Sequence, residues 1–330
     1  MERYINSYAT ENDIQIALQN GELFKPYVAY IEDADRIDWN SKTKIVDYTT
    51  EYLTFNILSA GTINWTASNT AIKKTIEYKL NNNEWASITS NTDSSAPTIN
   101  VVKGDKIQFR GNNTAYGEST SSYSTFGSST AEFEVEGNIM SLIYGDDFKN
   151  NSTISSDYVF ISLFGNCTKL VSAKNLILPA TTLAYGCYRT MFNGCSNLRT
   201  APKLPATTLA GSCYSNMFNG CTSLTVAPEL PVTTLATYCY QGMFGGCTSL
   251  TVAPELPATI LTEACYSFMF DGCSSLNYIK CLATNIYASD CTRYWVSGVT
   301  STGTFVKNPN ISGWPTGKNG IPEGWTIIDA

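Results

Sequence analysis

The sequence predicts a mainly β protein with short helices, in which an N-terminal docking segment and a β-sandwich precede a capped solenoid of 26-residue units. Three observations lead to this fold class. Cysteine and methionine recur every 26 residues in the second half, short strand-like runs fill much of the first half, and 43% of the residues are hydrophobic against 15% charged. That balance excludes a disordered chain. The expected parts are 1–50 for docking, 51–137 for the β-sandwich, 138–158 as a junction, 159–306 for the repeats and 307–330 for a closing segment.

The repeats define the second half. Three columns of residues are spaced by 26: Cys187, Cys213, Cys239, Cys265 and Cys291; Cys195, Cys221, Cys247 and Cys273; and Met191, Met217, Met243 and Met269. A fixed period of this length is typical of coils that stack on one another. A degenerate unit from 159 and a truncated one from 291 flank the regular units, as expected for caps that close the core at each end.

Each unit reads as one coil with two faces. Cys-Tyr-x-x-Met-Phe places apolar residues at i, i+1, i+4 and i+5, which predicts a short helix that ends at the following Gly-Cys. Leu-Thr-Val-Ala predicts a strand, and the prolines after it block both helix continuation and central pairing in a sheet. We therefore expect the Leu, Met, Phe and Cys side chains to point into the core.

The run Met217-Phe218-Asn219-Gly220-Cys221-Thr222-Ser223-Leu224 resembles the repeat core of the BspA-like (Treponema pallidum-type) leucine-rich repeats. The resemblance covers about residues 159–306, and the segment from Trp295 to Trp325 is similar to the C-terminal ends of such proteins from gut Bacteroidetes and their crAss-like tailed phages. It implies a leucine-rich-repeat solenoid, in a family that is typically displayed outside cells for adhesion.

Residues 51–137 predict an immunoglobulin-like β-sandwich. Apolar and polar residues alternate in six short runs separated by turn residues, at 52–57, 62–65, 75–80, 98–102, 107–110 and 131–136. The stretch from Gly111 to Thr130 is rich in Ser, Thr, Asn and Gly, so we expect a mobile loop or a displayed tip there.

Residues 1–50 are too few for a sizeable core of their own, so we expect them to dock on other proteins. A capping pattern from Thr10 to Asp13 predicts a short helix that ends at Gly21, and residues 26–39 predict a hairpin. The run from Lys25 to Asp33 resembles N-terminal segments of phage virion proteins.

All 11 cysteines lie at or beyond Cys167. Their Cys-x7-Cys spacing does not match zinc knuckles and no histidine is available, so no metal or other cofactor is expected. Buried free thiols that fill small apolar spaces are the favoured interpretation, and disulfides between adjacent coils are the alternative. Cys281 occupies the variable slot of Lys203, Glu229 and Glu255, which predicts an exposed thiol.

Composition excludes most familiar chemistry. Without histidine there is no Ser-His-Asp or Cys-His nucleophile, and the chain contains no paired Asp/Glu motif, so we expect a non-enzymatic protein.

The tetrapeptide from Tyr144 to Asp147 matches a polymerase metal motif but is better explained as a solvated turn. A net charge of −7 without a basic patch argues against nucleic acid, and neither an export signal nor an apolar stretch for membrane insertion is expected.

Variable positions within the repeats form the candidate recognition surface. Ladders of exposed side chains on a rigid solenoid make a binding surface, and the alternative is that these positions vary because nothing constrains them. The candidates are Ser215, Asn216, Gln241, Gly242, Ser267 and Phe268 on the predicted helical face, Asn193, Asn219, Gly245 and Asp271 before the glycine, and Lys203, Glu229 and Glu255 between the prolines.

The function hypothesis is a phage virion protein, a head or tail fibre or a capsid decoration, made in the host cytoplasm and exposed on the particle. Residues 1–50 would attach to other virion proteins, and the repeats would contact a host-surface glycan or protein. By class we expect a homo-oligomer, with a trimer as the typical fibre state. The alternative is a bacterial cell-surface adhesin whose export signal is missing from this sequence, and a carboxylate enzyme on the β-sandwich is a third reading.

Overall fold

The computed structural model describes residues 47–68, 71–92, 95–311 and 313–330. The chain divides into two compact units, Met1–Asp47 and Tyr48–Ala330, and the second is the one described here. Most of the predicted docking segment, with its expected helix and hairpin, lies outside the described residues. The predicted mainly β class is confirmed, with 27% strand and 5% helix arranged in several sheets.

The described residues up to the first coil form three sheets, the largest of which ends in a strand of that coil, β11. A six-stranded sheet has the order β11-β10-β1-β7-β4-β5, a two-stranded sheet pairs β2 with β6, and a three-stranded sheet has the order β3-β9-β8. Their strands are β1 (Leu53–Ile57), β2 (Gly61–Asn64), β3 (Thr66–Ala67), β4 (Thr75–Leu80), β5 (Ala86–Thr89), β6 (Thr98–Val101), β7 (Lys106–Arg110), β8 (Gly117–Ser119), β9 (Ser122–Thr125), β10 (Phe133–Asn138) and β11 (Leu170–Ile177). All six predicted strand runs are confirmed.

The stretch from Gly111 to Thr130, expected to be a mobile loop or displayed tip, instead contains β8 and β9. Two aromatic residues in it explain the difference, because Tyr116 and Phe126 are fully buried and anchor the segment to the core. Phe126 packs 4.9 Å from Phe55 and 5.0 Å from Phe109 between ring centroids. The many polar residues of this segment suggested a loop, although Tyr116 and Phe126 within it belong to the core.

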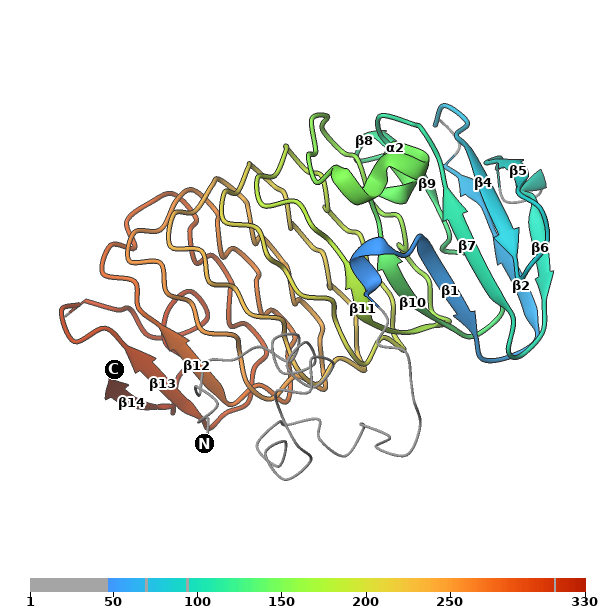
Figure 1. Cartoon of the computed structure of the whole chain (residues 1–330). Helices are drawn as coiled ribbons and strands as arrows, with labels where there is room; N and C mark the ends of the chain where they lie inside the picture. Colours follow the sequence, from blue (N-terminus) through green and yellow to red (C-terminus); the bar gives the residue numbers. More distant parts are fainter. Residues whose placement is uncertain (1–46, 69–70, 93–94, 312) are drawn as a thin grey trace, which may run out of the picture. The chain divides into compact units, whose positions relative to one another are not determined.

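The six-stranded sheet joins the two halves. Short helices η3 (Tyr48–Thr50), α2 (Ser141–Tyr144) and η5 (Gly145–Asn150) flank it. Strand β10 pairs antiparallel with β1 but parallel with β11, which belongs to the first coil of the repeats. Phe164 in that coil lies 5.9 Å from Phe55, so the repeat core continues into the core of the strand region. Figure 1 shows β1, β10 and β11 side by side at this junction.

Successive units of the second half stack with equivalent residues next to each other, as the row of coils in Figure 1 shows. The amide of Tyr188 donates to the carbonyl of Cys213 across 3.0 Å, and Tyr214 does the same to Cys239. Isolated bridges such as Thr182 to Thr208 link the opposite side of the coils. Each coil therefore satisfies its backbone groups through its neighbours.

The predicted short helix in each unit is wrong. Met191 donates to the carbonyl of Tyr188 three residues back, whereas the next amide, that of Phe192, donates across to Met217 in the following coil. Every fourth residue adopts a left-handed conformation, for example Thr190 at φ 53° and Gly194 at φ 72°. The segment is thus a run of turns like type II turns, which require a positive φ at their third residue. An apolar pattern of i, i+1, i+4, i+5 fits this period of four as well as a helix.

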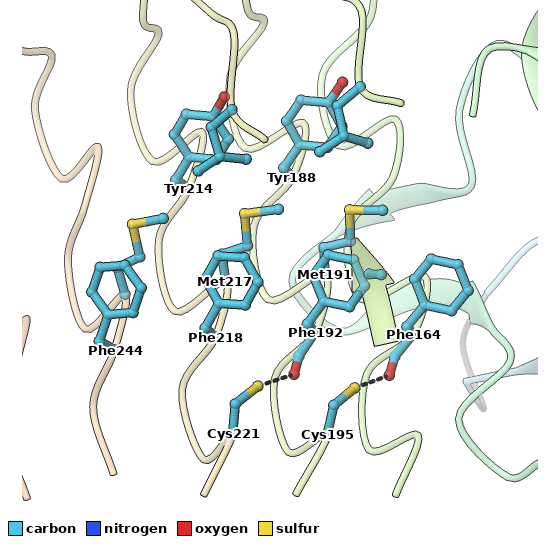
Figure 2. Close-up of a cluster of buried hydrophobic side chains, with 14 of the residues drawn as sticks. Phe164, Tyr188, Met191, Phe192, Cys195, Tyr214, Met217, Phe218, Cys221 and Phe244 are labelled. Carbon is cyan, nitrogen blue, oxygen red and sulfur yellow. Dashed lines mark hydrogen bonds between the residues drawn. The ribbon is translucent and has the colours of Figure 1, made fainter. Parts of the chain in front are cut away.

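The predicted inward Leu, Met, Phe and Cys columns are confirmed, because all are buried. Their aromatic rings form ladders along the stack: Phe192 lies 5.5 Å from Phe218 at 3° between ring planes, and Tyr188 lies 5.8 Å from Tyr214 at 9°. Figure 2 shows the phenylalanine and tyrosine ladders with the methionines between them. Near-parallel stacking at coil spacing makes each interface a copy of the next.

The last coil is covered by the C-terminal segment. Strands β12 (Tyr278–Cys281), β13 (Thr304–Lys307) and β14 (Thr326–Asp329) form a parallel sheet. Where a further coil would supply acceptors, the Oδ1 atom of Asn319 accepts the amide of Tyr294 at 2.7 Å. The carbonyl of Gly320 accepts the indole N–H of the buried Trp295 at 2.8 Å. The segment thus replaces the hydrogen bonds of a missing neighbour.

Candidate functional site

The candidate recognition residues do not form a single exposed surface. Three of them, Lys203, Glu229 and Glu255, are exposed as expected. Six are half-buried: Asn193, Asn216, Asn219, Gln241, Phe268 and Asp271. Four are buried, namely Ser215, Gly242, Gly245 and Ser267, which corrects the expectation that these positions display exposed side chains.

Side chains from the preceding coil cause this burial. A Cβ atom added to Gly242 would meet Oδ1 of Asn216 at 2.2 Å, and one added to Gly245 would meet Nδ2 of Asn219 at 2.4 Å. The two asparagines therefore lean over the glycines of the next coil. Asn193 in turn donates to Oδ1 of Asn219 at 3.4 Å. This part of the face is a layer of mutually packed amides, whose partly exposed edges remain available to a ligand.

The slot between the prolines carries charge along the stack. Lys203 and Glu229 occupy it in two coils, and in the next coil Glu255 forms a 3.1 Å ion pair with Lys280. Because both partners of that pair are partly exposed, it contributes little to stability. The slot is a line of exposed charges of both signs.

Cys281 does not belong to this slot, which corrects the expected exposed thiol. It is fully buried and bridges to Leu256, 25 residues earlier, whereas Val252 bridges to Tyr278 at the usual spacing of 26. One residue is therefore missing from the fourth coil between these bridges. The shift turns Cys281 into the core and places Lys280 beside Glu255.

Exposed threonine pairs form a second surface that sequence reasoning missed. In three coils two adjacent threonines follow Pro-Ala or Pro-Val, and all six are exposed: Thr181, Thr182, Thr207, Thr208, Thr233 and Thr234. The hydroxyl of Thr207 donates to the carbonyl of Thr181 at 3.4 Å, which aligns this column with the stack. The repeated Ala-Thr-Thr-Leu or Val-Thr-Thr-Leu in the sequence was the available signal.

Exposed apolar side chains lie on the strand side of the coils. Val226 is 72% exposed and Val252 is 49% exposed, at equivalent positions of adjacent coils. Ile260, in the threonine column, is 61% exposed. Together with the threonines, they give the stack a surface of methyl and hydroxyl groups.

The cysteines are free and all eleven are buried, in agreement with the favoured interpretation. Burial raises the pKa of Cys187, and likewise that of Cys265, to about 12. Because the thiolate is the nucleophile and the metal ligand, these thiols are chemically inert at neutral pH. Within the described residues no group of three or more Cys, Asp or Glu side chains is placed to hold a metal ion.

The polymerase-like tetrapeptide has a structural role. Asp146 accepts a 2.7 Å hydrogen bond from the Tyr52 hydroxyl and two from the Arg110 guanidinium, at 2.7 and 2.9 Å. These bonds hold the pKa of Asp146 below its usual range. Arg110 also pairs with Glu77 at 2.8 Å and lies 4.3 Å from the Trp85 ring. The carboxylate thus fastens η5 to β7, in line with the favoured reading as a turn.

Comparison with protein-family models, curated proteins and solved structures found no match. No helix in the described ranges is long and apolar enough to cross a membrane.

Proposed function

We propose that the protein is a non-enzymatic structural component of a phage particle that displays a recognition surface. In this proposal the stacked coils form a capped leucine-rich-repeat solenoid, the strand region is an immunoglobulin-like β-sandwich, and residues 1–50 attach to other virion proteins. The protein would be made in the host cytoplasm and exposed on the particle. Its ligand would be a glycan or protein of the host surface.

The observation that carries the recognition part is the regular stack itself. Hydrogen bonds such as that from Tyr188 to Cys213 repeat in each coil and fix equivalent side chains at coil spacing. Exposed Thr182 and Thr208 lie on adjacent coils, as do exposed Val226 and the half-exposed Val252. Repetition on a rigid backbone suits an extended ligand, because the side chains are already ordered and binding costs little conformational entropy.

Buried thiols support synthesis in a reducing compartment. Eleven free, buried cysteines fit a protein that folds in a cytoplasm, where thiols stay reduced. A phage protein folds there before lysis exposes it. A secreted adhesin would instead have to fold while its thiols met an oxidising environment.

Immunogold labelling tests the proposal. An antibody against residues 159–306 is applied to a source culture separated into cells and released phage particles. Gold on particles supports the virion role and shows whether head or tail carries the protein. Gold on the envelopes of uninfected cells, with none on particles, overturns it in favour of the adhesin.

Oligomeric state is tested separately. As the proposal includes a homo-oligomer of the fibre type, sedimentation velocity of the purified full chain at micromolar concentration should give a species larger than 36.1 kDa, with a trimer as the expected state. A monomer at micromolar concentration would contradict this part of the proposal and leave the particle location to the labelling experiment.

A further inference from the structure

Two aromatic residues at the C-terminal end of the stack occupy backbone positions that disfavour them. Phe268 and Tyr294 have φ values of 56° and 51°, in the left-handed region where bulky side chains are rare. Gly242 holds the same position in the preceding coil, with φ 60°. Thr190 and Asn216 share this conformation in the earlier coils, so the turn sets the backbone and the two aromatic side chains are what distinguishes this end of the column.

The two rings stack on each other at the surface. Their centroids lie 5.4 Å apart with 10° between planes, and both residues are only half-buried. The preceding residue of the column, Gly242, contributes no side chain against Phe268. The aromatic pair therefore ends against Gly242, over which the Asn216 amide leans, and its exposed part is the side of the rings that faces solvent.

Two cations surround this pair. The Arg293 guanidinium lies 5.8 Å from the Phe268 ring and 5.6 Å from the Tyr294 ring, and the Lys318 ammonium lies 4.2 Å from the Tyr294 ring. Arg293 pairs with Asp290 only at 3.8 Å, and both side chains are more than half exposed. Since that pair is long and open to water, most of the guanidinium donors remain available.

The loop that carries Lys318 is held against the last coil, and a shallow hollow lies beside it. Asn319, next to Lys318, accepts the amide of Tyr294 and so holds the loop against the last coil. A shallow hollow of about 460 Å³ lies beside it, with Asp290, Arg293, Tyr294 and Asn319 among its lining residues. Arg293 and Tyr294 thus line the depression, and Lys318 and Phe268 lie against the Tyr294 ring beside it.

We propose that this aromatic and cationic cluster binds the carboxylate-bearing sugar of an acidic glycan. The pyranose ring lies in the hollow with its C–H groups against the exposed edge of the aromatic pair, and its carboxylate receives charge-assisted hydrogen bonds from Arg293 and Lys318. Asp290 and Asn319 offer acceptors and donors for the sugar hydroxyls. This inference rests on the proposed recognition function and names the ligand class for it.

Isothermal titration of the purified full chain tests the site. The probes are sialyllactose against lactose, and glucuronic acid against glucose, each pair differing chiefly in the carboxylate. We expect binding of the acidic member and at least tenfold weaker binding of the neutral one, because a hydrogen bond to a charged group is lost. Equal binding of both members, or no binding of either acidic sugar at millimolar concentration, would overturn the proposal.

Charge variants locate the site. Arg293→Gln and Lys318→Gln should each weaken sialyllactose binding roughly tenfold, whereas Lys103→Gln, an exposed lysine in the strand region, makes the same charge change and should leave binding unaltered. Unchanged binding in both site variants, or an equal loss with Lys103→Gln, would contradict the assignment.

Phe268→Gly separates binding from structure. Because Gly242 already fills this position in the neighbouring coil, the variant should keep its melting temperature within a few degrees and lose affinity. Retained affinity would contradict the role of the ring. The immunogold result is independent of all these titrations, so failure of the sugar site and failure of the virion proposal are distinguishable.

Discussion

The thiol of Cys221 donates a hydrogen bond to the carbonyl oxygen of Phe192, in the preceding coil, across 3.2 Å. The same bond recurs from Cys195 to Phe164 at 3.0 Å and from Cys247 to Phe218 at 3.2 Å. Figure 2 shows two of these bonds beneath the phenylalanine ladder. The second cysteine column therefore links adjacent coils through its thiols as well as filling space.

Serine substitution should distinguish the two cysteine columns. Cys221→Ser keeps a donor for the Phe192 carbonyl. No carbonyl accepts the thiol proton of the buried Cys213 among the described residues, so Cys213→Ser buries a hydroxyl donor without an acceptor. We expect the free energy of unfolding to fall by about 1 kcal/mol more in Cys213→Ser than in Cys221→Ser. Urea denaturation followed by circular dichroism measures both, and equal losses would contradict a specific thiol bond.

Alkaline pH should destabilise the protein steeply. Burial raises the pKa of Cys167 and Cys281 to about 12, whereas an unfolded cysteine titrates near about 8.5. Between these values the folded state keeps protons that the unfolded state loses. The stabilisation is complete well below about pH 8.5 and is lost as pH rises toward 12, by about 1.4 kcal/mol per pH unit for each such thiol once the pH exceeds about 8.5.

Urea unfolding under reducing conditions at pH 7.5, 8.5 and 9.5 measures this effect. We expect the midpoint to fall already between the first two values, because about half of the thiols of the unfolded chain are ionised at pH 8.5, and to fall more steeply to the third. A thiol reagent added at pH 7.5 should react only slowly with the cysteines of the native protein. In denaturant it should react readily with all eleven cysteines. A midpoint that does not change up to pH 9.5 would contradict the shifted thiols.

Two buried tyrosines should respond oppositely to loss of the hydroxyl. The buried Tyr188 hydroxyl has no hydrogen-bond partner in the described part of the chain, whereas the Tyr116 hydroxyl donates to the carbonyl of Leu142 at 2.6 Å. Phe160, which stacks 5.8 Å from Tyr188, shows that phenylalanine fits this column. We expect Tyr188→Phe to raise the free energy of unfolding by about 1 kcal/mol and Tyr116→Phe to lower it by a similar amount.

Thermal unfolding of the two variants and the natural chain compares these effects directly. Since both substitutions remove a single oxygen from a buried ring, each serves as the control for the other. A loss of stability in Tyr188→Phe would mean that its hydroxyl has a partner.

The period of the repeats predicted the buried columns, but two local features lay beyond it. The turns in place of helices depend on left-handed residues such as Thr190 and Asn216, whose side chains give no glycine signal. The one-residue deletion before Cys281 is hidden because Cys265 and Cys291 keep the spacing of 26. Sequence columns therefore identify what faces the core more reliably than where one coil changes register.

The candidate surface was harder to predict for a related reason. Whether a variable position is exposed depends on the side chain of the coil beside it, as Asn216 covers Gly242. The clustering of Phe268 with Arg293 and Lys318 needs the C-terminal loop to lie against the last coil, and nothing in the repeat pattern specifies that contact. These are packing relationships between segments, which spacing alone does not encode.

Removal of one whole coil should leave a folded protein. Deletion of residues 213–238 joins Ser212 to Cys239, and Ser212 and Tyr238 share the left-handed conformation at φ 55° and 57°, so the new junction needs no strained change of backbone. In the natural chain the Tyr214 ring stacks on Tyr188 at 5.8 Å and on Tyr240 at 5.9 Å between centroids. After the deletion, Tyr188 would stack directly on Tyr240 in the same way. In a stack whose coils contact only their neighbours, the free energy of unfolding should fall by the contribution of one coil and one interface between coils.

The expected result is a cooperative thermal transition at a lower melting temperature, with an unchanged circular dichroism signal per residue. Deletion of residues 213–225 is the control, since removal of half a unit places strand residues against turn residues and should abolish the transition. If both deletions unfold the protein, the coils are not interchangeable and the stack depends on the individual side chains of that unit. If both fold equally well, the register observed between the coils does not determine the fold.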